Sequence, residues 1–376
     1  MKLLVVDHNA LDPIHRLLYE ELSRKGNIDI RLLVPSEWFD GYRMLRGAEE
    51  HPAPKLSVYP CNVLFKTRTH RLIYRGLAEH LKAFAPDILY MNSEPENFQT
   101  LQGARLVGDA SLKFIFSSWR NIDHRAAGFP YKFGKFHAYA ERTVLRRANH
   151  AILFNKDGTE IYRQLGFDAT TYIPPYVDVR YFFPKPEGAH DTNSPWRICY
   201  IGRFITEKGL DTLLKAAANL TFPYSISLIG DGPAKTEWEQ LARTLGIEQN
   251  VLWIPPVLHS EVPNRLHEAD VVVLPSKTGK MWKEQFGRVI IEAMACGVPV
   301  VGSDSGEIPK VIGDAGMVFP EGSEQALKEK LAELHADMEL RDQLVSKGLQ
   351  RLNSEYSLER AINSYLQVFN GVIASA

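Results

Sequence analysis

Short apolar runs and helical apolar periodicities alternate along the first half of this 376-residue chain. A short apolar run bounded by polar residues predicts a strand buried in a sheet. Such runs occupy Leu3–Asp7, Ile28–Val34, Asp87–Met91, Lys113–Ser117, His150–Phe154 and Thr171–Ile173. Helical periodicity fills intervals between them, among others at Leu11–Lys25, Arg68–Phe84 and Glu141–Arg147. This alternation predicts the α/β class, with a parallel sheet between layers of helices.

The alternation stops at a proline-rich, irregular stretch, Pro174–Ser194, and restarts at Trp196. The last segment, Ser357–Val372, has the pattern of an amphipathic helix. We therefore predict an N-terminal domain over residues 1–175, a linker over 176–195, a C-terminal domain over 196–355 and a terminal helix over 356–376. The chain is long enough for both domains to bury full cores.

One segment of the C-terminal domain combines two carboxylates with a helix start. It reads Glu284-Gln-Phe-Gly-Arg-Val-Ile-Ile-Glu292, and Gly297 then ends the helix before an apolar strand at Val298–Val301. Phe286-Gly287 lets backbone amides approach a ligand, because glycine has no Cβ. A helix N-terminus beside a carboxylate suits an anion that carries hydroxyl groups, such as a sugar nucleotide. Two glutamates at this spacing also occur by chance, but Glu292 lies beside an apolar stripe, where an unpaired carboxylate is costly.

A second segment, Arg197 to Asp211, reads as a strand, a turn containing Gly202, and a helix. Arg203 and Lys208 flank the turn, at the end of a strand where α/β proteins bind ligands. Two cations there favour an anion, although solvated surface charges are the ordinary alternative. No G-x-G-x-x-G follows the strand, so the turn is not a dinucleotide fingerprint.

Together these segments resemble the family 4 glycosyltransferases, a retaining group with the GT-B fold. The resemblance rests on the motifs of residues 196–320 and is thinner at 146–154 and 173–178. It also draws on the turn Leu228–Pro233 and on the stretches Ala269–Ser276 and Gly302–Ile312. It implies two Rossmann-like domains facing a central cleft, with the terminal helix crossing back to the N-terminal domain.

The resemblance also implies a role for each motif residue. Arg203 and Lys208 are expected to neutralise the donor phosphates and Glu284 to contact the transferred sugar, so these three are the expected catalytic residues. The expected donor-binding residues are Gly202, Arg203, Lys208, Val257, Glu284, Phe286, Gly287 and Glu292. Among them, Glu292 is expected to accept hydrogen bonds from the ribose hydroxyls, and the backbone at Val257 to touch the base.

No D-x-D motif occurs in the chain, so the usual metal–diphosphate motif is missing. We expect no metal and no other cofactor, with the two cations supplying the electrostatic work. The resemblance implies retention by attack on the same face of the sugar, in which the leaving phosphate helps to deprotonate the acceptor.

The chain departs from the family pattern on the acceptor side. The first loop reads Asp7-His-Asn-Ala-Leu-Asp-Pro13 where the family has Gly-Gly. His8 and Asn9 are candidates to face the acceptor, and a helix-capping loop is equally compatible. After Ser117, where the family has a histidine, this chain has Ser118-Trp-Arg-Asn121. Asn121 and His124 are therefore the remaining acceptor-side candidates.

Composition bears on the cellular location of the protein. The three cysteines, Cys61, Cys199 and Cys296, form no metal-ligand motif, which favours buried reduced thiols and a cytoplasmic protein. The segment before Asp7 is too short for a signal sequence, and no apolar run approaches the ~20 residues of a membrane-spanning helix.

Charge divides unevenly along the chain. Residues 1–180 hold 25 Lys and Arg against 20 Asp and Glu, whereas the remainder holds 19 against 25. Aromatic residues are interleaved with the basic residues of 118–147. Solvated helix faces explain this pattern as well as an anionic partner does. For such a partner, a bilayer or a lipid-linked pyrophosphate fits better than nucleic acid, because no nucleic-acid motif accompanies the charge.

We therefore expect transfer of a sugar from a nucleoside-diphosphate sugar to a glycan or lipid-linked acceptor, as in cell-envelope or polysaccharide synthesis, with peripheral contact to the membrane. Two alternatives remain open. One is a sugar-nucleotide epimerase with the same fold, and the other is a non-catalytic subunit that binds sugar nucleotides.

Overall fold

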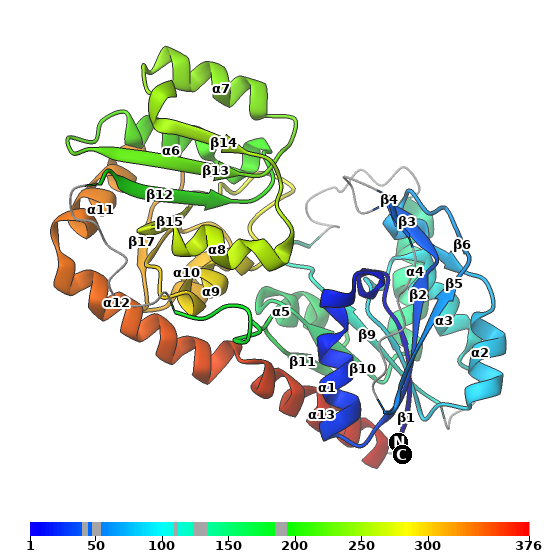
Figure 1. The fold of residues 1–376 in the computed structure, drawn as a ribbon. Helices are drawn as coiled ribbons and strands as arrows, with labels where there is room; N and C mark the ends of the chain where they lie inside the picture. Colours follow the sequence, from blue (N-terminus) through cyan, green and yellow to red (C-terminus); the bar gives the residue numbers. More distant parts are fainter. Residues whose placement is uncertain (40–43, 47–53, 109–111, 124–133, 185–193, 376) are drawn as a thin grey trace. The chain divides into compact units, whose positions relative to one another are not determined.

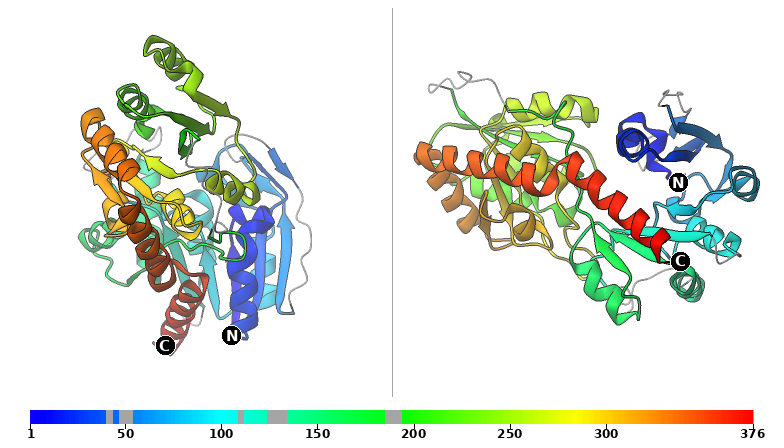
Figure 2. Two further views of the ribbon diagram at one scale, coloured as in Figure 1. Left: turned by 60° about the vertical axis from the view of Figure 1, so that its left-hand side comes forward. Right: turned by 90° about the horizontal axis from the view of Figure 1, so that it is seen from below.

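The computed structural model describes residues 1–39, 44–46, 54–108, 112–123, 134–184 and 194–375. The chain forms two compact units, Met1–Pro174 with Ala361–Ala376, and Pro175–Arg360. Each unit contains a parallel sheet with helices on both faces (Figures 1 and 2). The predicted α/β class and the two Rossmann-like sheets of the GT-B fold are confirmed.

The sheet of the first unit has seven strands in the order β11-β10-β9-β8-β1-β2-β5. Their bounds are β1 Lys2–Val6, β2 Asp29–Pro35, β5 Leu56–Cys61, β8 Ile88–Met91, β9 Lys113–Ser118, β10 His150–Leu153 and β11 Thr170–Tyr172. The central strand β8 is apolar along its whole length because helices cover both faces of the sheet, and all four of its residues are buried. Two antiparallel ribbons accompany the sheet: β3 Glu37–Phe39 with β4 Met44–Arg46, and β6 Val63–Leu64 with β7 Ile73–Tyr74.

The helices of this unit are α1 Leu17–Lys25, α2 Leu77–Phe84, α3 Phe98–Leu106, α4 Gly134–Arg147 and α5 Asp157–Gln164. The helix predicted for Arg68–Phe84 is wrong. That stretch contains the turn η3 (Thr69–Arg71) and strand β7 before α2 begins, because Gly76 adopts a left-handed conformation (φ +82°) that a helix cannot continue through. The helix predicted from Leu11 starts as two 3₁₀ turns, η1 Asn9–Leu11 and η2 Pro13–Arg16.

The second sheet has six strands in the order β14-β13-β12-β15-β16-β17. Their bounds are β12 Trp196–Ile201, β13 Tyr224–Ile229, β14 Val251–Ile254, β15 Val271–Leu274, β16 Val300–Ser303 and β17 Met317–Phe319. The helices are α6 Leu210–Ala217, α7 Lys235–Thr244, α8 Val262–His267, α9 Arg288–Ala295, α10 Ile308–Ile312, α11 Glu324–Ala336 and α12 Met338–Arg351. Short turns lie at η4 Thr206–Lys208, η5 Glu248–Asn250, η6 His259–Glu261 and η7 Leu352–Tyr356.

The described part of the expected linker packs within the second unit. The Val177 N–H donates to the Tyr356 carbonyl at 3.0 Å, and Phe182 is buried. The terminal helix is α13, Leu358–Ala374, and the first unit includes it from Ala361 onward. In the described residues, no helix is both long and apolar enough to span a bilayer.

Both sheets reverse their strand order at one point. In the first unit the chain winds outward through β1, β2 and β5 and then returns to β8 on the other side of β1. In the second it winds through β12, β13 and β14 and then returns to β15 beside β12. Crevices form at the carboxyl ends of strands at such switch points, and ligands bind there. The loops after β12 and β15, and those after β1 and β8, are therefore where a site is expected.

Candidate active site

Lys208 and Glu284 meet at the switch point of the second sheet. Lys208 ends the turn that follows β12, and Glu284 lies in the loop between β15 and α9. The Lys208 Nζ donates to Glu284 Oε2 at 2.6 Å, and the Ser276 hydroxyl donates to the same oxygen at 2.8 Å. The Lys208 ammonium also lies 5.3 Å from the centre of the Trp282 ring. An ammonium has three N–H donors, so Lys208 can hold this carboxylate and still donate to an anion.

The loop after β16 fixes the backbone of Glu284. The Glu307 N–H donates to the Glu284 carbonyl at 3.1 Å. Gly306, with φ +57°, approaches so closely that a Cβ there would lie 2.1 Å from the same carbonyl oxygen. The position of this carboxylate therefore depends on a glycine in the loop of the neighbouring strand.

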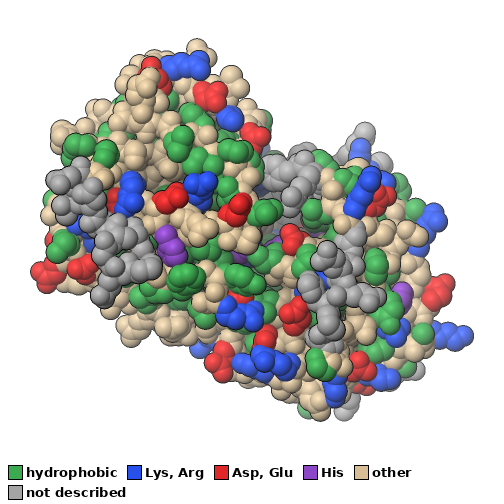
Figure 3. All heavy atoms as spheres, in the orientation of Figure 1, with side chains coloured by type: hydrophobic (Ala, Val, Ile, Leu, Met, Phe, Trp, Pro, Cys, Tyr) green, Lys and Arg blue, Asp and Glu red, His purple; other side chains and the backbone are tan. Residues whose placement is uncertain are grey.

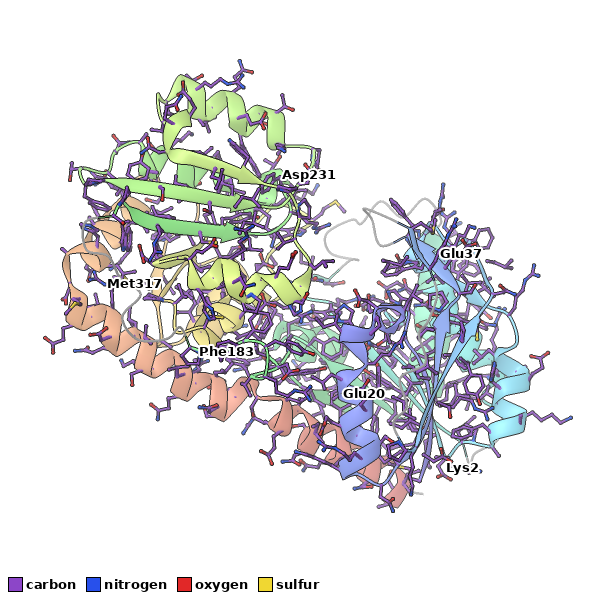
Figure 4. The ribbon with its side chains drawn as sticks, in the orientation of Figure 1. Lys2, Glu20, Glu37, Phe183, Asp231 and Met317 are labelled. Atoms are coloured by element: carbon purple, nitrogen blue, oxygen red, sulfur yellow. The ribbon has the colours of Figure 1, made fainter. Side chains whose placement is uncertain are left out.

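Arg203 is an exposed side chain on a tightly fixed backbone. It follows Gly202 in the first turn of the unit, and the next residue, Phe204, donates its N–H to the Asp231 carbonyl at 2.8 Å. Asp231, labelled in Figure 4, belongs to the turn Leu228–Pro233 after β13, so the two turns pack directly on each other. A cation on a rigid turn beside the switch point is suited to bind an anion.

Glu292 lies on α9 with a partner that the sequence did not reveal. The His259 Nε2 lies 3.0 Å from Glu292 Oε1, and since an ionised carboxylate only accepts, the histidine is the donor. The Phe182 ring packs 5.2 Å from the His259 ring, centre to centre. Burial raises the pKa of Glu292, but the hydrogen bond from His259 and the charges of Arg288 and His259 bring that pKa below its usual value. The carboxylate is therefore ionised and held in one orientation.

The remaining donor-side candidates are Phe286, Gly287 and Val257. Phe286 is buried, with its ring 5.7 Å from that of Tyr356, so its side chain belongs to the core. Gly287 caps α9 in a left-handed conformation, φ +81°. Val257 lies half-buried in the loop between β14 and η6, close in sequence to His259.

A second polar cluster lies at the switch point of the first sheet. Asp7, directly after β1, accepts hydrogen bonds from the Tyr19 hydroxyl at 2.6 Å and the Asn92 amide at 2.7 Å. The Ser117 hydroxyl donates to the Asn92 side-chain amide oxygen, Oδ1, at 2.5 Å. These hydrogen bonds link the carboxyl ends of three neighbouring strands, β1, β8 and β9.

The two candidates in the first loop, His8 and Asn9, follow directly after Asp7. His8 is buried, with its ring 4.8 Å from that of Trp38, and burial lowers its pKa. The structure therefore gives His8 a packing contact. Asn9 is half-buried and begins η1, and the Asp12 side chain accepts from the Ile14 N–H to cap η2. The capping alternative for this loop is thus present in the structure.

Glu94, which follows β8, was not among the predicted site residues. Its carboxylate accepts from the Ser118 hydroxyl and from the Trp119 N–H, each at 2.6 Å. Burial and the nearby Glu96 raise the pKa of Glu94 to about 7. Its position at the end of a buried strand is the one signal of it in the sequence.

The basic stretch that begins at residue 118 is partly internal. Arg120 is buried and forms ion pairs with Glu96, at 2.7 Å, and with Glu141. This arginine is therefore not available to an external anion, contrary to the expectation for the stretch as a whole. Asn121 is also buried, and His124 lies outside the described residues.

Burial raises the pKa of the Cys61 thiol to about 11 and those of Cys199 and Cys296 to about 12. All three thiols are free, as predicted for Cys61, Cys199 and Cys296.

In the part of the chain that the structure describes, no group of three His, Cys, Asp or Glu side chains is arranged to hold a metal ion.

Comparison with solved structures defines the class of protein. The fold matches sucrose-phosphate synthase from Thermosynechococcus elongatus, with a TM-score of 0.78, 18% identity and 100% of each chain covered. It also matches Anabaena HepE in complex with UDP, with a TM-score of 0.76, 18% identity and coverage of 99% of this chain and 100% of the other. The chain has the GT-B fold.

A family model matches part of the sequence. Residues 186–351 match the model of the family described as glycosyl transferases group 1. The chain is 29% identical to N-acetyl-alpha-D-glucosaminyl L-malate synthase of Bacillus anthracis over 62% of its length and 54% of that protein. It is 30% identical to alpha-D-kanosaminyltransferase of Streptomyces kanamyceticus over 44% of its length and 42% of that protein. The chain thus spans about half the length of these curated relatives.

Proposed function

We propose that the protein is a retaining, metal-independent glycosyltransferase of family 4. It moves a sugar from a nucleoside-diphosphate sugar to a glycan or lipid-linked acceptor, in cell-envelope or polysaccharide synthesis. The observation that carries the proposal is the pairing of Lys208 with Glu284 at the switch point of a group 1 domain. Anabaena HepE, which shares the fold, is complexed with UDP, and this supports a nucleotide donor.

In this proposal the donor lies across the loops after β12, β14 and β15. Arg203 and Lys208 contact the two phosphates, and the ribose hydroxyls donate to Glu292, which His259 holds in place at 3.0 Å. The backbone near Val257 touches the base. The backbone amides of Phe286 and Gly287 contact sugar or phosphate oxygens at the start of α9.

The reaction exchanges one bond at the anomeric carbon for another. The bond to the leaving phosphate breaks while the acceptor oxygen forms its bond on the same face, and the acceptor proton passes to the leaving phosphate. Negative charge grows on that phosphate as the bond breaks, so its contacts with Arg203 and Lys208 strengthen toward the transition state. Glu284 contacts the transferred sugar and orients it.

The acceptor side is proposed to lie in the first unit, at the carboxyl ends of β1, β8 and β9. There Glu94 is a carboxylate that can accept a hydrogen bond from an acceptor hydroxyl. We further propose that the protein works in the cytoplasm, at the inner face of an anionic membrane.

Donor binding and turnover test the proposal. A thermal-shift screen with UDP-, GDP- and ADP-sugars reports binding, because a ligand of the folded state raises the melting temperature. Product analysis then distinguishes the classes: a transferase releases nucleoside diphosphate mainly when an acceptor is present, whereas an epimerase converts the sugar without releasing it. Binding without either product would indicate a binding subunit. Absence of any shift across the screen would overturn the assignment.

A further inference from the structure

The first unit contains an apolar groove. Its volume is about 620 Å³, within the roughly 300–1,000 Å³ typical of ligand pockets. The apolar lining comes from β7, α2, α3 and α4 and includes Ile73, Leu77, Phe98, Leu101, Leu106 and Phe136. Leu77 and Leu101 are buried, whereas Leu106 and Phe136 are 37% and 38% exposed. The groove thus has an apolar floor and an apolar rim that reaches the surface.

Cations lie beside this apolar rim. Arg75 and Arg105 line the groove and are exposed, against one acidic residue of the lining, Glu79. The Arg105 guanidinium lies 5.7 Å from the centre of the Tyr139 ring on α4. Arg105 therefore connects the groove with the outer face of that helix.

The outer face of α4 is basic and aromatic. Lys135, Tyr139, Arg142 and Arg146 are all exposed, and their spacing of four, three and four residues places them on one side of the helix. The acidic residue of α4, Glu141, points inward to Arg120 and leaves this face without a negative charge. On the face drawn in Figure 3, basic and acidic side chains are mixed.

Basic and aromatic side chains on one exposed helix face are typical of proteins that bind the surface of anionic membranes. The apolar groove that opens beside this face provides space for a hydrocarbon chain. A soluble anion has no such chain. A lipid carries both parts, a chain for the groove and a phosphate for the arginines.

We propose that the groove binds the hydrocarbon chain of an anionic lipid, whose phosphate contacts Arg75 and Arg105 while the outer face of α4 rests on the bilayer. This inference deepens the membrane attachment proposed above and rests on it. It does not depend on the donor site, which belongs to the second unit.

A series of n-alkyl phosphates from butyl to octyl, kept below micelle formation, tests the inference by calorimetry. Each methylene buried in the groove is expected to tighten binding about fourfold until the groove is full. Inorganic phosphate and octyl glucoside report the headgroup and the chain alone, and both are expected to bind more weakly than octyl phosphate. Affinity that is independent of chain length would overturn the inference, and this arm needs no variant.

Two matched pairs of variants locate the site. Ala78 is exposed and lines the groove, whereas Ala83 is exposed on the same helix, outside the lining. Ala78→Trp is expected to weaken octyl phosphate binding at least tenfold and leave inorganic phosphate unchanged, with Ala83→Trp as the control. Arg105→Gln is expected to weaken both ligands, and Lys82→Gln neither.

Equal affinities for the two tryptophan variants would refute the site. Sedimentation with phosphatidylglycerol and phosphatidylcholine vesicles then separates lipid from free phosphate as the natural ligand, and binding to inorganic phosphate alone would contradict the proposal. The thermal shift with nucleotide sugars, measured in the same variants, reports the donor site separately. Loss of octyl phosphate binding without loss of the nucleotide-sugar shift, or the reverse, therefore shows which of the two proposals fails.

Discussion

Replacement of Gly306 by alanine should disturb Glu284 from a neighbouring loop. The new Cβ would lie 2.1 Å from the Glu284 carbonyl oxygen and 3.0 Å from its carbonyl carbon and its nitrogen. Because these are backbone atoms, no side-chain rotation relieves the overlap. Either loop has to move, and the Lys208–Glu284 contact moves with it.

The loss of stability expected in Gly306→Ala has two parts. A left-handed backbone (φ +57°) costs alanine about 1–2 kcal/mol, and overpacking adds about 1–3 kcal/mol. Gly246→Ala is the matched control, since Gly246 is also left-handed at φ +70° but a Cβ there meets nothing within 4 Å. At about 2–4 °C per kcal/mol, Gly306→Ala should melt about 2–12 °C below Gly246→Ala.

Thermal unfolding measures the loss of stability, and donor turnover measures the effect of displacing Glu284. A displacement of the carboxylate by about 1 Å is expected to lower turnover by about a hundredfold, whereas the control should retain the rate of the unmodified protein. Equal melting temperatures and equal rates in the two variants would refute the reasoning, because the overlap would then be relieved without moving Glu284.

Glu292→Ala and Arg203→Ala should each weaken donor binding about tenfold to a hundredfold, since a charge-assisted contact is worth about 1.5–3 kcal/mol; calorimetry checks this, with exposed Glu237→Ala as the control. Turnover should survive a strong chelator, and loss of activity that a divalent metal restores would contradict the electrostatic role of Arg203 and Lys208. Unfolding at several pH values tests Glu94. Its pKa is about 7 in the folded protein, so between pH ~4.3 and about 7 the folded state binds a proton that the unfolded chain has lost, and stability falls as the pH rises through this window. Glu94→Gln should flatten that fall, and an unchanged profile would exclude Glu94 as its source. Binding to phosphatidylglycerol vesicles should weaken as salt is raised, and no binding at low salt would argue for a soluble acceptor.

Most of the fold could be predicted because buried strands in an α/β protein are continuous apolar runs. Strand β8 illustrates this, since all of its residues are apolar and buried. Strand β5 was not among the predicted strands. It contains Pro60 and is an edge strand, where a missing N–H is tolerated. The error at Arg68–Phe84 has a local cause: its apolar spacing fits a helix, but Gly76 breaks it.

Residues of the candidate site could be predicted only where they belong to a sequence motif. Glu284 and Lys208 came from separate motifs, and no pattern in either shows that their side chains form an ion pair. His259 and Ser276 are single polar residues in loops, and the sequence does not indicate which carboxylate each one contacts. Their partners depend on strand order, which brings the loops after β12, β14, β15 and β16 together at one edge.

The first unit is built from both ends of the chain, and this imposes an order on its synthesis. Ile362, Tyr365 and Phe369 of α13 are buried in it, with the last two rings 6.2 and 6.0 Å from the Tyr90 ring. At ~5–20 residues per second, the ribosome needs roughly 10–40 s after Pro174 to make them. The second unit is complete at Arg360. The half of the protein that is made first is therefore the half that is completed last, because part of its core is supplied by the helix that is translated last.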